Sequence, residues 1–385
     1  MDLTPPGNKD TIYDAIIIGA GISGLACART LQKRGLNFLV LSKDIGGRIL
    51  RTKDNQANLG AYYVHKGYKN IWPWLKINRR ISWQNIYFYK DGKTQSIWKM
   101  LNLRLILEGL RLMLILKKFK RKLEANGKRI ETQSFNQALS NDEHFKNVFY
   151  KPATQFIKEN KLENITTRFL NQAIASSIFC DVSSINTGVF LSALLPLIMP
   201  TFEYEFKIKD FIAPFEKQII ITEAQKTVKK QDTYEILADA KKFQTKNLIL
   251  AVPAHTAAAL LQKEIKVKGD TNVLVYYLEG ELVTNLKKTK GMLIFSSEPI
   301  YCALKQQNGN YIIYAKNKIE NFSKYFIRYK LIENKYWNPA LQIMGNETLA
   351  EDRGDGLYMI GDYNAAGLEA AYLTGVYIGN TINYV

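Results

Sequence analysis

Three glycines near the start of the chain have the spacing of a phosphate-binding turn. Gly19, Gly21 and Gly24 follow an apolar run at 16–18 and open a predicted helix. In a G-x-G-x-x-G turn the first glycine permits the tight turn, the second lets the backbone approach a pyrophosphate, and the third packs helix on strand. The helix N-terminus then faces the phosphates with about half a positive charge. The pattern predicts a dinucleotide-binding site.

The residue expected to hold the ribose of that dinucleotide is a serine. The next predicted strand ends at Ser42, where such sites usually place a carboxylate. A hydroxyl can make the same hydrogen bond without charge assistance, at a cost of about 1 kcal/mol, or several-fold in affinity. Asp44, two residues later, is the alternative ligand.

A second strand and glycine turn lie near the end of the chain. An apolar strand at 356–360 ends at Gly361 and Asp362, and a helix of small residues begins near Leu368. A dinucleotide held at the first turn and covered by the second is the arrangement of a flavoprotein. The two ends of the chain are therefore expected to form one site.

Two segments that follow the first turn resemble those of the flavin-containing amine oxidases. Residues 45–48 end in Gly47-Arg48, and residues 58–65 read Asn-Leu-Gly-Ala-Tyr-Tyr-Val-His. The strand at 248–253 and the C-terminal turn and helix are similar to further segments of this superfamily. It includes monoamine and polyamine oxidases, protoporphyrinogen oxidase and carotenoid desaturases.

The resemblance implies a bound FAD and roles for residues around it. Arg48 would offer its guanidinium to the pyrophosphate. Gly60 and Ala61 would leave room for the flavin ring beside the backbone. The motif for covalent attachment through cysteine is absent, so the FAD is expected to be non-covalent.

Three further cofactor contacts are implied by the same resemblance. Val228 matches the position whose backbone meets the adenine, and Asp362 matches the one at the ribityl-phosphate region. The helix from Leu368 would direct its free N–H groups at the N1–C2 edge of the ring. Negative charge develops there on reduction, so a helix N-terminus would stabilise the reduced flavin.

Two positions depart from the amine oxidase pattern. The lysine that begins the strand beneath the flavin corresponds to Asn272, and the aromatic cage residue corresponds to Gly367. His65 lies where polyamine oxidases have a histidine near the substrate channel. His65 and Asn272 are therefore the catalytic candidates, although a structural or surface role is the more common one for a histidine such as His65. Four aromatic residues are candidates for the pocket or the core: Tyr62, Tyr63, Trp337 and Tyr363.

Dehydrogenation is the expected reaction. A hydride would pass from an amine-bearing or lipophilic small molecule to flavin N5, and the electrons to O2 or another acceptor. One alternative is a protoporphyrinogen-oxidase-like or desaturase-like reaction on a membrane-derived molecule. The other is a flavin-binding protein without turnover that acts as an interaction module. With three histidines and no clustered carboxylates, no metal site is expected.

Three strand–turn–helix units, at 12–34, 247–261 and 356–375, must position these residues. The stretch 67–205 is predicted to be mainly helical, and 266–339 carries alternating strands such as 273–278 and 311–315. The predicted fold class is α/β, with a Rossmann-like FAD-binding domain and an inserted α+β substrate domain. The boundaries are 1–66, 206–265 and 340–385 for the FAD-binding domain, and 67–205 and 266–339 for the substrate domain.

Charge and composition restrict the setting. The chain has 385 residues, a net charge of +18 and three cysteines without metal or disulfide spacing, which suits a reducing compartment. The first residues lack a signal peptide pattern, and no apolar run reaches the ~18–20 residues that span a bilayer. A cytoplasmic protein is expected, with peripheral membrane attachment as an option. Nucleic acid is not an expected partner, because no nucleic-acid-binding motif accompanies the charge.

The basic residues concentrate in a predicted helix at 97–123. Its charged stripe comprises Arg104, Glu108, Arg111, Lys118 and Lys122, and its wide apolar face Leu101, Leu105, Leu112, Met113, Ile115 and Leu116. This helix either packs on the substrate domain with the stripe in solvent, or lies on an anionic membrane surface.

Overall fold

The computed structural model describes residues 11–82, 85–100, 102–130, 132–266, 269–287, 289, 291–296, 298–342 and 349–382. Residues 1–6 and Leu101, which enter the sequence predictions above, lie outside these ranges.

The glycine-turn half is a seven-stranded sheet in the order β8-β2-β1-β11-β10-β9, with β17 also paired to β11. Strands β1, β2, β8, β17 and the end of β11 are parallel, whereas β9 and β10 form an antiparallel hairpin onto the start of β11. The bounds are β1 Ile12–Ala20, β2 Phe38–Ile45, β8 Ile219–Ile221, β9 Ala224–Lys230, β10 Thr233–Ala238, β11 Lys241–Leu250 and β17 Leu357–Met359. This is the Rossmann-like α/β layer predicted from the sequence.

Three helices, one from each end of the chain and one from its middle, pack on this sheet. They are α1 (Ile22–Arg34), α10 (Ala254–Leu261) and α11 (Leu368–Thr381). The α1 helix ends where predicted, at Gly35 in the left-handed conformation with φ +73°. Helix α11 packs closely on α1 because its glycines face that helix, and a Cβ at Gly375 would lie 2.0 Å from Ser23 O. The two ends of the chain are therefore in contact.

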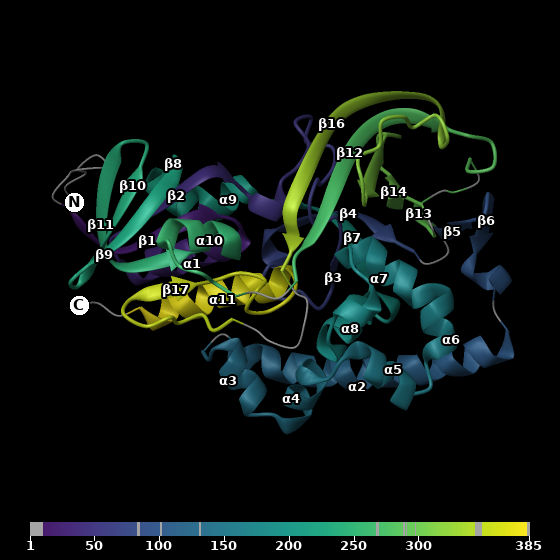
Figure 1. Ribbon diagram of the computed structural model, residues 1–385, viewed down its shortest axis with the longest axis horizontal. Coiled ribbons are helices and arrows are strands. Elements are labelled where there is room, and N and C mark those ends of the chain that lie inside the picture. Colours follow the sequence, from purple (N-terminus) through teal and green to yellow (C-terminus); the bar gives the residue numbers. More distant parts are fainter. Residues whose placement is uncertain are drawn as a thin grey trace.

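The other half consists of a seven-stranded mixed sheet and a helical layer. The sheet order is β16-β12-β15-β14-β13-β5-β6, and the long antiparallel pair of strands β12 and β16 arches over the molecule (Figure 1). The bounds are β5 Ile86–Lys90, β6 Lys93–Ser96, β12 Thr271–Leu282, β13 Met292–Phe295, β14 Ile300–Lys305, β15 Tyr311–Ala315 and β16 Phe326–Leu341. A small sheet, β3 (Val64–His65), β7 (Thr201–Phe206) and β4 (Leu75–Ile81), lies between the halves.

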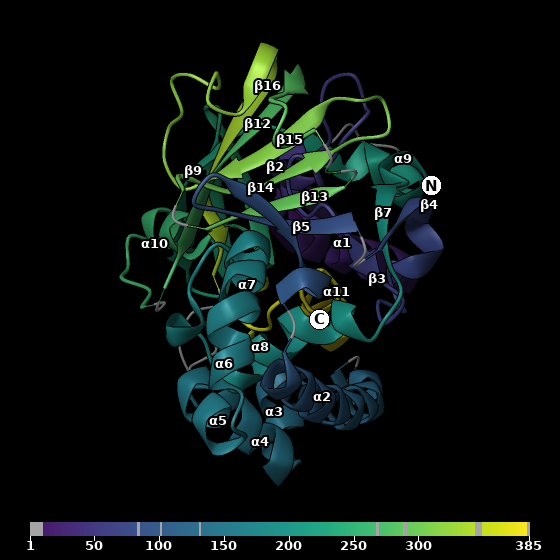
Figure 2. The same cartoon turned by 90° about the vertical axis from the view of Figure 1, so that its right-hand side faces the viewer.

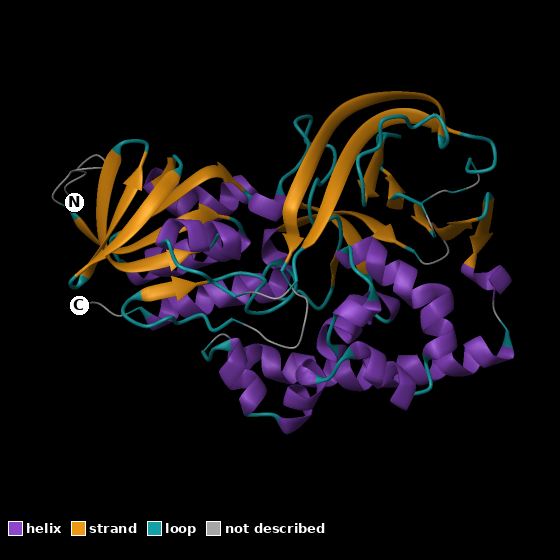
Figure 3. Ribbon diagram, in the orientation of Figure 1, coloured by secondary structure: helices purple, strands orange, loops and turns teal. Residues whose placement is uncertain are grey.

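The helices of the middle stretch gather on one side of the molecule (Figure 3). The bounds are α2 Leu103–Ile130, α3 Phe135–Ser140, α4 Glu143–Tyr150, α5 Ala153–Glu159, α6 Glu163–Ile165, α7 Asn171–Ile178 and α8 Thr187–Leu194. The short helix α9, Ile208–Ile212, lies apart from them, in the nucleotide-binding half. Residues 67–205 are mainly helical as predicted, but Leu75–Ile81, Ile86–Lys90 and Lys93–Ser96 form strands β4, β5 and β6. The long helix begins at Leu103 rather than 97, after a short 3₁₀ turn at Ile97–Met100. No described helix is long and apolar enough to cross a membrane.

Candidate cofactor and substrate site

In the glycine turn after β1, two glycines are closely packed and the third borders open space. A Cβ at Gly19, where φ is +109°, would lie 2.5 Å from Ala251 O, and one at Gly24 would lie 2.0 Å from Gly19 O. At Gly21, by contrast, a Cβ would meet nothing within 4 Å. Gly19 and Gly24 are thus required by close packing, and the space before Gly21 is free for a phosphate group.

The helix that follows this turn presents a bare N-terminus to the same space. Gly21 is the N-cap residue of α1 and no side chain caps the helix. The first-turn N–H groups of a helix lack intrahelical acceptors and attract anions. Gly47, where φ is +51°, lies beside this turn, and its Cβ would be 3.1 Å from Gly21 Cα. These residues fit a dinucleotide pyrophosphate.

Ser42 holds the glycine turn in place. Its Oγ accepts a hydrogen bond from the Ala20 N–H (3.0 Å) and donates one to Asp44 O (2.7 Å). The hydroxyl proton is therefore committed, and only an acceptor lone pair is left for a ribose hydroxyl. The Asp44 side chain is exposed.

An ion pair joins the second motif to the C-terminal turn. The Arg48 guanidinium donates to both carboxylate oxygens of Asp362, at 2.5 and 2.7 Å, and to Ala340 O at 2.9 Å. Burial alone raises the pKa of the Asp362 carboxyl, but the charge and hydrogen bonds of Arg48 and the Gln342 N–H hold the pKa below its usual value. Arg48 also lines the main cavity, where Asp362 balances its positive charge.

Gly60 and Ala61 form the floor of that cavity. A Cβ at Gly60 would lie 1.9 Å from Arg48 O, and the Ala61 N–H donates to the same oxygen at 2.8 Å. The Tyr314 hydroxyl donates to Gly60 O at 2.9 Å. The absence of a side chain at Gly60 therefore lets residues 58–65 lie against residues 45–48.

The N-terminus of α11 opens onto the cavity from the C-terminal side. Leu368 lines it, and the N-cap residue Gly367 has φ +103° and no side-chain cap. A Cβ at Gly367 would meet only the Tyr68 hydroxyl, at 3.8 Å. The position where amine oxidases would have an aromatic wall is thus open space. Gly361 precedes Asp362 in the turn, and its N–H donates to Asn364 Oδ1 at 2.8 Å.

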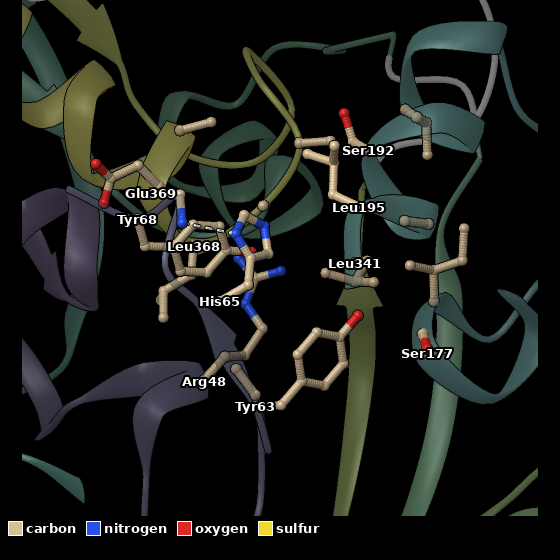
Figure 4. A pocket seen from close by; sticks show the side chains of 18 of the residues that line it. Arg48, Tyr63, His65, Tyr68, Ser177, Ser192, Leu195, Leu341, Leu368 and Glu369 are labelled. Carbon is tan, nitrogen blue, oxygen red and sulfur yellow. Dashed lines mark hydrogen bonds between the residues drawn. The ribbon is translucent and has the colours of Figure 1, made fainter. Parts of the chain in front are cut away.

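The cavity has a volume of about 420 Å³ and lies between the nucleotide-binding half and the helical layer. Figure 4 shows Arg48, Tyr63 and His65 directed into it, with Ser177 and Ser192 on the helical wall opposite. The lining is predominantly aromatic and aliphatic. Its aromatic residues are Tyr62, Tyr63, Tyr68, Phe135, Phe149, Phe179, Tyr314 and Trp337.

His65 is buried in the cavity wall in its neutral form. Its ring lies 4.2 Å from that of Tyr68, and its Nδ1 accepts the Gly67 N–H at 3.0 Å. Burial, and next the charge of Lys120, lower the pKa of His65 to about 4. Because Nδ1 is an acceptor, the single proton is assigned to Nε2. His65 thus offers one N–H donor and no charge at neutral pH.

The structure does not support Asn272 as a catalytic residue. Asn272 is exposed, whereas the next residue, Val273, is 1% exposed and lines the cavity. Successive side chains of a strand point to opposite faces of the sheet, so only one of this pair faces the cavity. The strand is where the resemblance placed it, but the residue that it presents is a valine.

Val228 is likewise not brought to the end of β2. It lies within β9, paired with Glu235 of β10. The residues of this segment that contact the end of β2 are Thr222, whose N–H donates to Ser42 O at 2.9 Å, and Glu223, paired with Lys43. Val228 is six residues beyond Thr222, which corresponds to about 20 Å along an extended chain.

Some cavity residues carried no sequence signal. Tyr62, Tyr63 and Trp337 line the cavity as considered, but Tyr363 is buried and donates its hydroxyl to Leu250 O and Ile360 O, at 3.0 Å each. The helical wall brings in Lys120, Phe135, Phe149, Ser177, Phe179, Val189 and Ser192. These residues lie in a stretch without a recognisable motif, whose sequence predicts helices but not which side chains face a cavity. No group of three or more potential metal ligands occurs among the described residues.

Comparison with known proteins agrees with this geometry. Residues 17–77 match the NAD(P)-binding Rossmann-like domain family. A pseudooxynicotine dehydrogenase from Pseudomonas sp is 37% identical over 71 residues, which are 17% of this chain and 14% of that protein.

Solved structures match over nearly the whole chain. A fatty acid isomerase from P. acnes has a TM-score of 0.71 at 11% identity, covering 97% of this chain and 99% of that one. Putrescine oxidase bound to putrescine has 0.66 at 12%, also covering 97% and 99%. Cyclohexylamine oxidase from Brevibacterium oxydans has 0.65 at 12%, with the same coverage. The chain thus has the α/β fold of these solved structures, which include putrescine oxidase and cyclohexylamine oxidase.

Proposed function

We propose that this chain is an FAD-dependent oxidoreductase that removes a hydride from a lipophilic or amine-bearing small molecule. The observation that carries the proposal is the continuity of two sites. Gly47 lies beside the open cradle at Gly21, the next residue, Arg48, lines the aromatic cavity, and the bare N-terminus of α11 faces the same cavity. A dinucleotide at the cradle would extend its reactive ring into the cavity.

The non-covalent cofactor would be held by backbone and by two charged groups. Gly19, Gly21, Gly24 and the N-terminus of α1 would take the pyrophosphate, with Gly47 leaving room beside them. Ser42 would accept a hydrogen bond from the ribose. The remaining contacts are assigned to Arg48, Gly60, Ala61, Gly361, Asp362 and Leu368. When bound, FAD supplies the hydride acceptor, which no side chain can provide.

The side chains of the cavity would orient the substrate and exclude water. Aromatic walls leave little polar surface for solvent, which strengthens the remaining polar contacts. Catalysis would rest on holding a C–H bond about 3–3.5 Å from the acceptor atom. His65 would donate its Nε2–H to the substrate without changing charge near neutral pH.

The charges around the cavity favour a lipophilic substrate over a cationic one. The Glu369 carboxylate accepts hydrogen bonds from the Asn70 N–H (2.7 Å), the Asn70 amide (2.9 Å) and the Ile71 N–H (3.2 Å), so it is already engaged. Glu124 lies 3.7 Å from Lys120. No free carboxylate therefore awaits an ammonium group among the described lining residues.

An amine remains the second candidate, because aromatic faces attract cations. Tyr62 and Tyr63 lie edge to face with centroids 4.8 Å apart and line the same cavity as Gly367. The structural neighbours include putrescine and cyclohexylamine oxidases. We also propose O2 or another small acceptor for reoxidation, and retain the domain boundaries given above.

Anaerobic reduction of bound flavin tests the proposal. The purified holoprotein is mixed with long-chain lipophilic compounds, porphyrinogens, polyenes and amines, and flavin absorbance is followed without oxygen. Bleaching by one class, reversed by admitting O2 or another acceptor, supports turnover and names the substrate class. A protein that binds FAD but is bleached by none of these classes would instead be a flavin-binding module without this chemistry.

A further inference from the structure

The outward face of α2 exposes a row of leucines. Leu103, Leu107, Leu110 and Leu114 are 73%, 54%, 60% and 68% exposed. Their spacing of four, three and four residues puts them on one face of the helix. The opposite face is fixed in the protein core by Leu105, Leu112, Leu116 and Phe119, each at most 2% exposed. The exposed row therefore belongs to a well-anchored helix.

This arrangement corrects the charged stripe expected from the sequence. Glu108 is only 5% exposed and accepts hydrogen bonds from the Asn164 amide at 2.7 Å and the Ile165 N–H at 2.8 Å. Arg104 pairs with this buried carboxylate, and Arg111 donates to the carbonyls of Asn160 and Lys161. The stripe thus belongs partly to the packed side, and the solvent side is apolar.

The same outward face becomes cationic towards the C-terminus of α2. Lys117, Lys118 and Arg121 continue the row, are exposed, and pair with no carboxylate in the part of the chain that the structure describes. From Leu103 to Arg121 the face runs for about 27 Å. Trp98, in the turn before α2, is 62% exposed. Tryptophan favours the boundary between water and lipid.

We propose that this face of α2 docks on an anionic phospholipid bilayer. The leucine row and Trp98 would enter the boundary of the acyl chains, and Lys117, Lys118 and Arg121 would contact lipid phosphates. The net charge of +18 adds a general attraction to such a surface.

A second copy of the chain fits this face less well. In an antiparallel contact the leucine half of one helix would lie against the cationic half of the other. A parallel contact would bring the cationic halves together. When the two faces overlap along their whole length, both arrangements leave charge against leucine or against like charge.

Docking would also place the cavity near the lipid. The inner side of α2 contributes Lys120, Leu123 and Glu124 to the cavity wall. Helix α2 lies on the opposite side of the molecule from the paired strands β12 and β16 (Figures 1 and 2). Entry of a lipophilic substrate from the bilayer follows only if the proposed function holds, whereas docking does not depend on it.

Vesicle co-sedimentation of the full chain tests the docking. Vesicles of equimolar phosphatidylcholine and phosphatidylglycerol should pellet the protein, and phosphatidylcholine alone or high salt should weaken binding. L110Q/L114Q should reduce partitioning at least about tenfold. K117Q/K118Q/R121Q should reduce it on anionic vesicles and remove most of the salt dependence.

Matched variants on other surfaces control for general effects. I327Q/Y336Q alters two residues of similar exposure on β16 (54% and 53%), and K226Q/K230Q/K241Q removes three exposed lysines of the nucleotide-binding sheet. Both should bind vesicles nearly as the wild type does. Absence of vesicle binding, or equal binding by L110Q/L114Q, overturns the proposal. So does a wild-type dimer that L110Q/L114Q converts to monomer without any vesicle binding. Flavin bleaching measured on the same samples reports separately on the proposed function.

Discussion

Arg48 and Asp362 lie 314 positions apart in the chain and form a two-point ion pair, with N···O distances of 2.5 and 2.7 Å. Arg48 also donates to Ala340 O, and the Gln342 N–H donates to Asp362. The pair therefore ties the segment after β2, the end of β16 and the C-terminal turn into one frame around the cavity.

Removing the charge of Asp362 should loosen this frame. D362N leaves Arg48 without its carboxylate, and we expect the free energy of unfolding to fall by about 2 kcal/mol, since Arg48 is partly exposed. K43M breaks the exposed Lys43–Glu223 pair and should cost less than about 0.5 kcal/mol. Urea denaturation of the wild type and the two variants measures both values. Equal effects would show that the Arg48–Asp362 pair stabilises the fold no more than the exposed pair does.

The pH dependence of this loss has a defined sign. The folded pKa of Asp362 lies below the ordinary 3.8, so its contribution is fully present above pH 3.8. It is lost as the pH falls through the lower folded pKa. The difference between wild type and D362N should therefore be constant from neutral pH down to about 4 and shrink only at more acid pH. A difference that disappears by pH 5 would contradict this assignment.

His65 predicts a separate acid sensitivity. Its folded pKa of about 4 lies below the ordinary 6.5, so the unfolded chain takes up the proton first. Stability should fall as the pH drops from 6.5 to 4, by up to about 3 kcal/mol, and H65N should remove that part of the slope. K120M should narrow this pH range only slightly, because burial lowers the pKa of His65 more than the charge of Lys120 does. Histidine NMR titration would detect the shifted ring directly, and a His65 pKa near 6.5 would refute it.

The sequence predicted the nucleotide-binding elements well because their signals are local. Gly19 and Gly24 lie in a strand–turn–helix whose hydrophobic period and glycine spacing are contained within about 30 residues. The same applies to the turn at Gly361 and the helix from Leu368. The expectation that the two turns share a site came from the general arrangement of flavoproteins. The Arg48–Asp362 pair adds a contact that no local pattern contains.

The predictions that the structure does not support depend on side-chain direction or on non-local packing. Asn272 and Val273 are neighbours in one strand, and only the register of the sheet decides which faces the cavity. Val228 lies in a hairpin whose path away from β2 has no local sequence signal. On α2 both faces are rich in leucine, so periodicity alone could not tell the buried row from the exposed one.

The contact between the two ends of the chain depends on Gly375. A Cβ there would lie 2.0 Å from Ser23 O, so G375A should separate α11 from α1 and destabilise the protein by about 1–3 kcal/mol. G109A makes the same change in the middle of α2, where a Cβ meets only Ile165 Cδ1 at 3.8 Å. It should be neutral or stabilise by up to about 1 kcal/mol. Thermal unfolding compares them, and a G375A protein as stable as G109A would contradict the close packing.

Ser42 should matter for the turn as well as for the cofactor. S42A removes the acceptor of the buried Ala20 N–H, so we expect a loss of about 1–3 kcal/mol in stability and several-fold in FAD affinity. S42T keeps the hydroxyl and should retain most of both. Urea denaturation of the apoprotein and fluorescence titration with FAD separate the two effects. If S42A bound FAD as tightly as S42T, the ribose assignment would be wrong.

FAD titration of the apoprotein tests the central claim most directly. Wild type should bind one FAD per chain and release it unmodified on denaturation. G21A should fold normally, because φ at Gly21 is −75° and its Cβ would meet nothing within 4 Å. G21E places bulk and negative charge where the pyrophosphate would lie, and it should fold like G21A but lose FAD binding. Wild-type protein that binds no FAD, or G21E that binds it as tightly as G21A, would contradict the account.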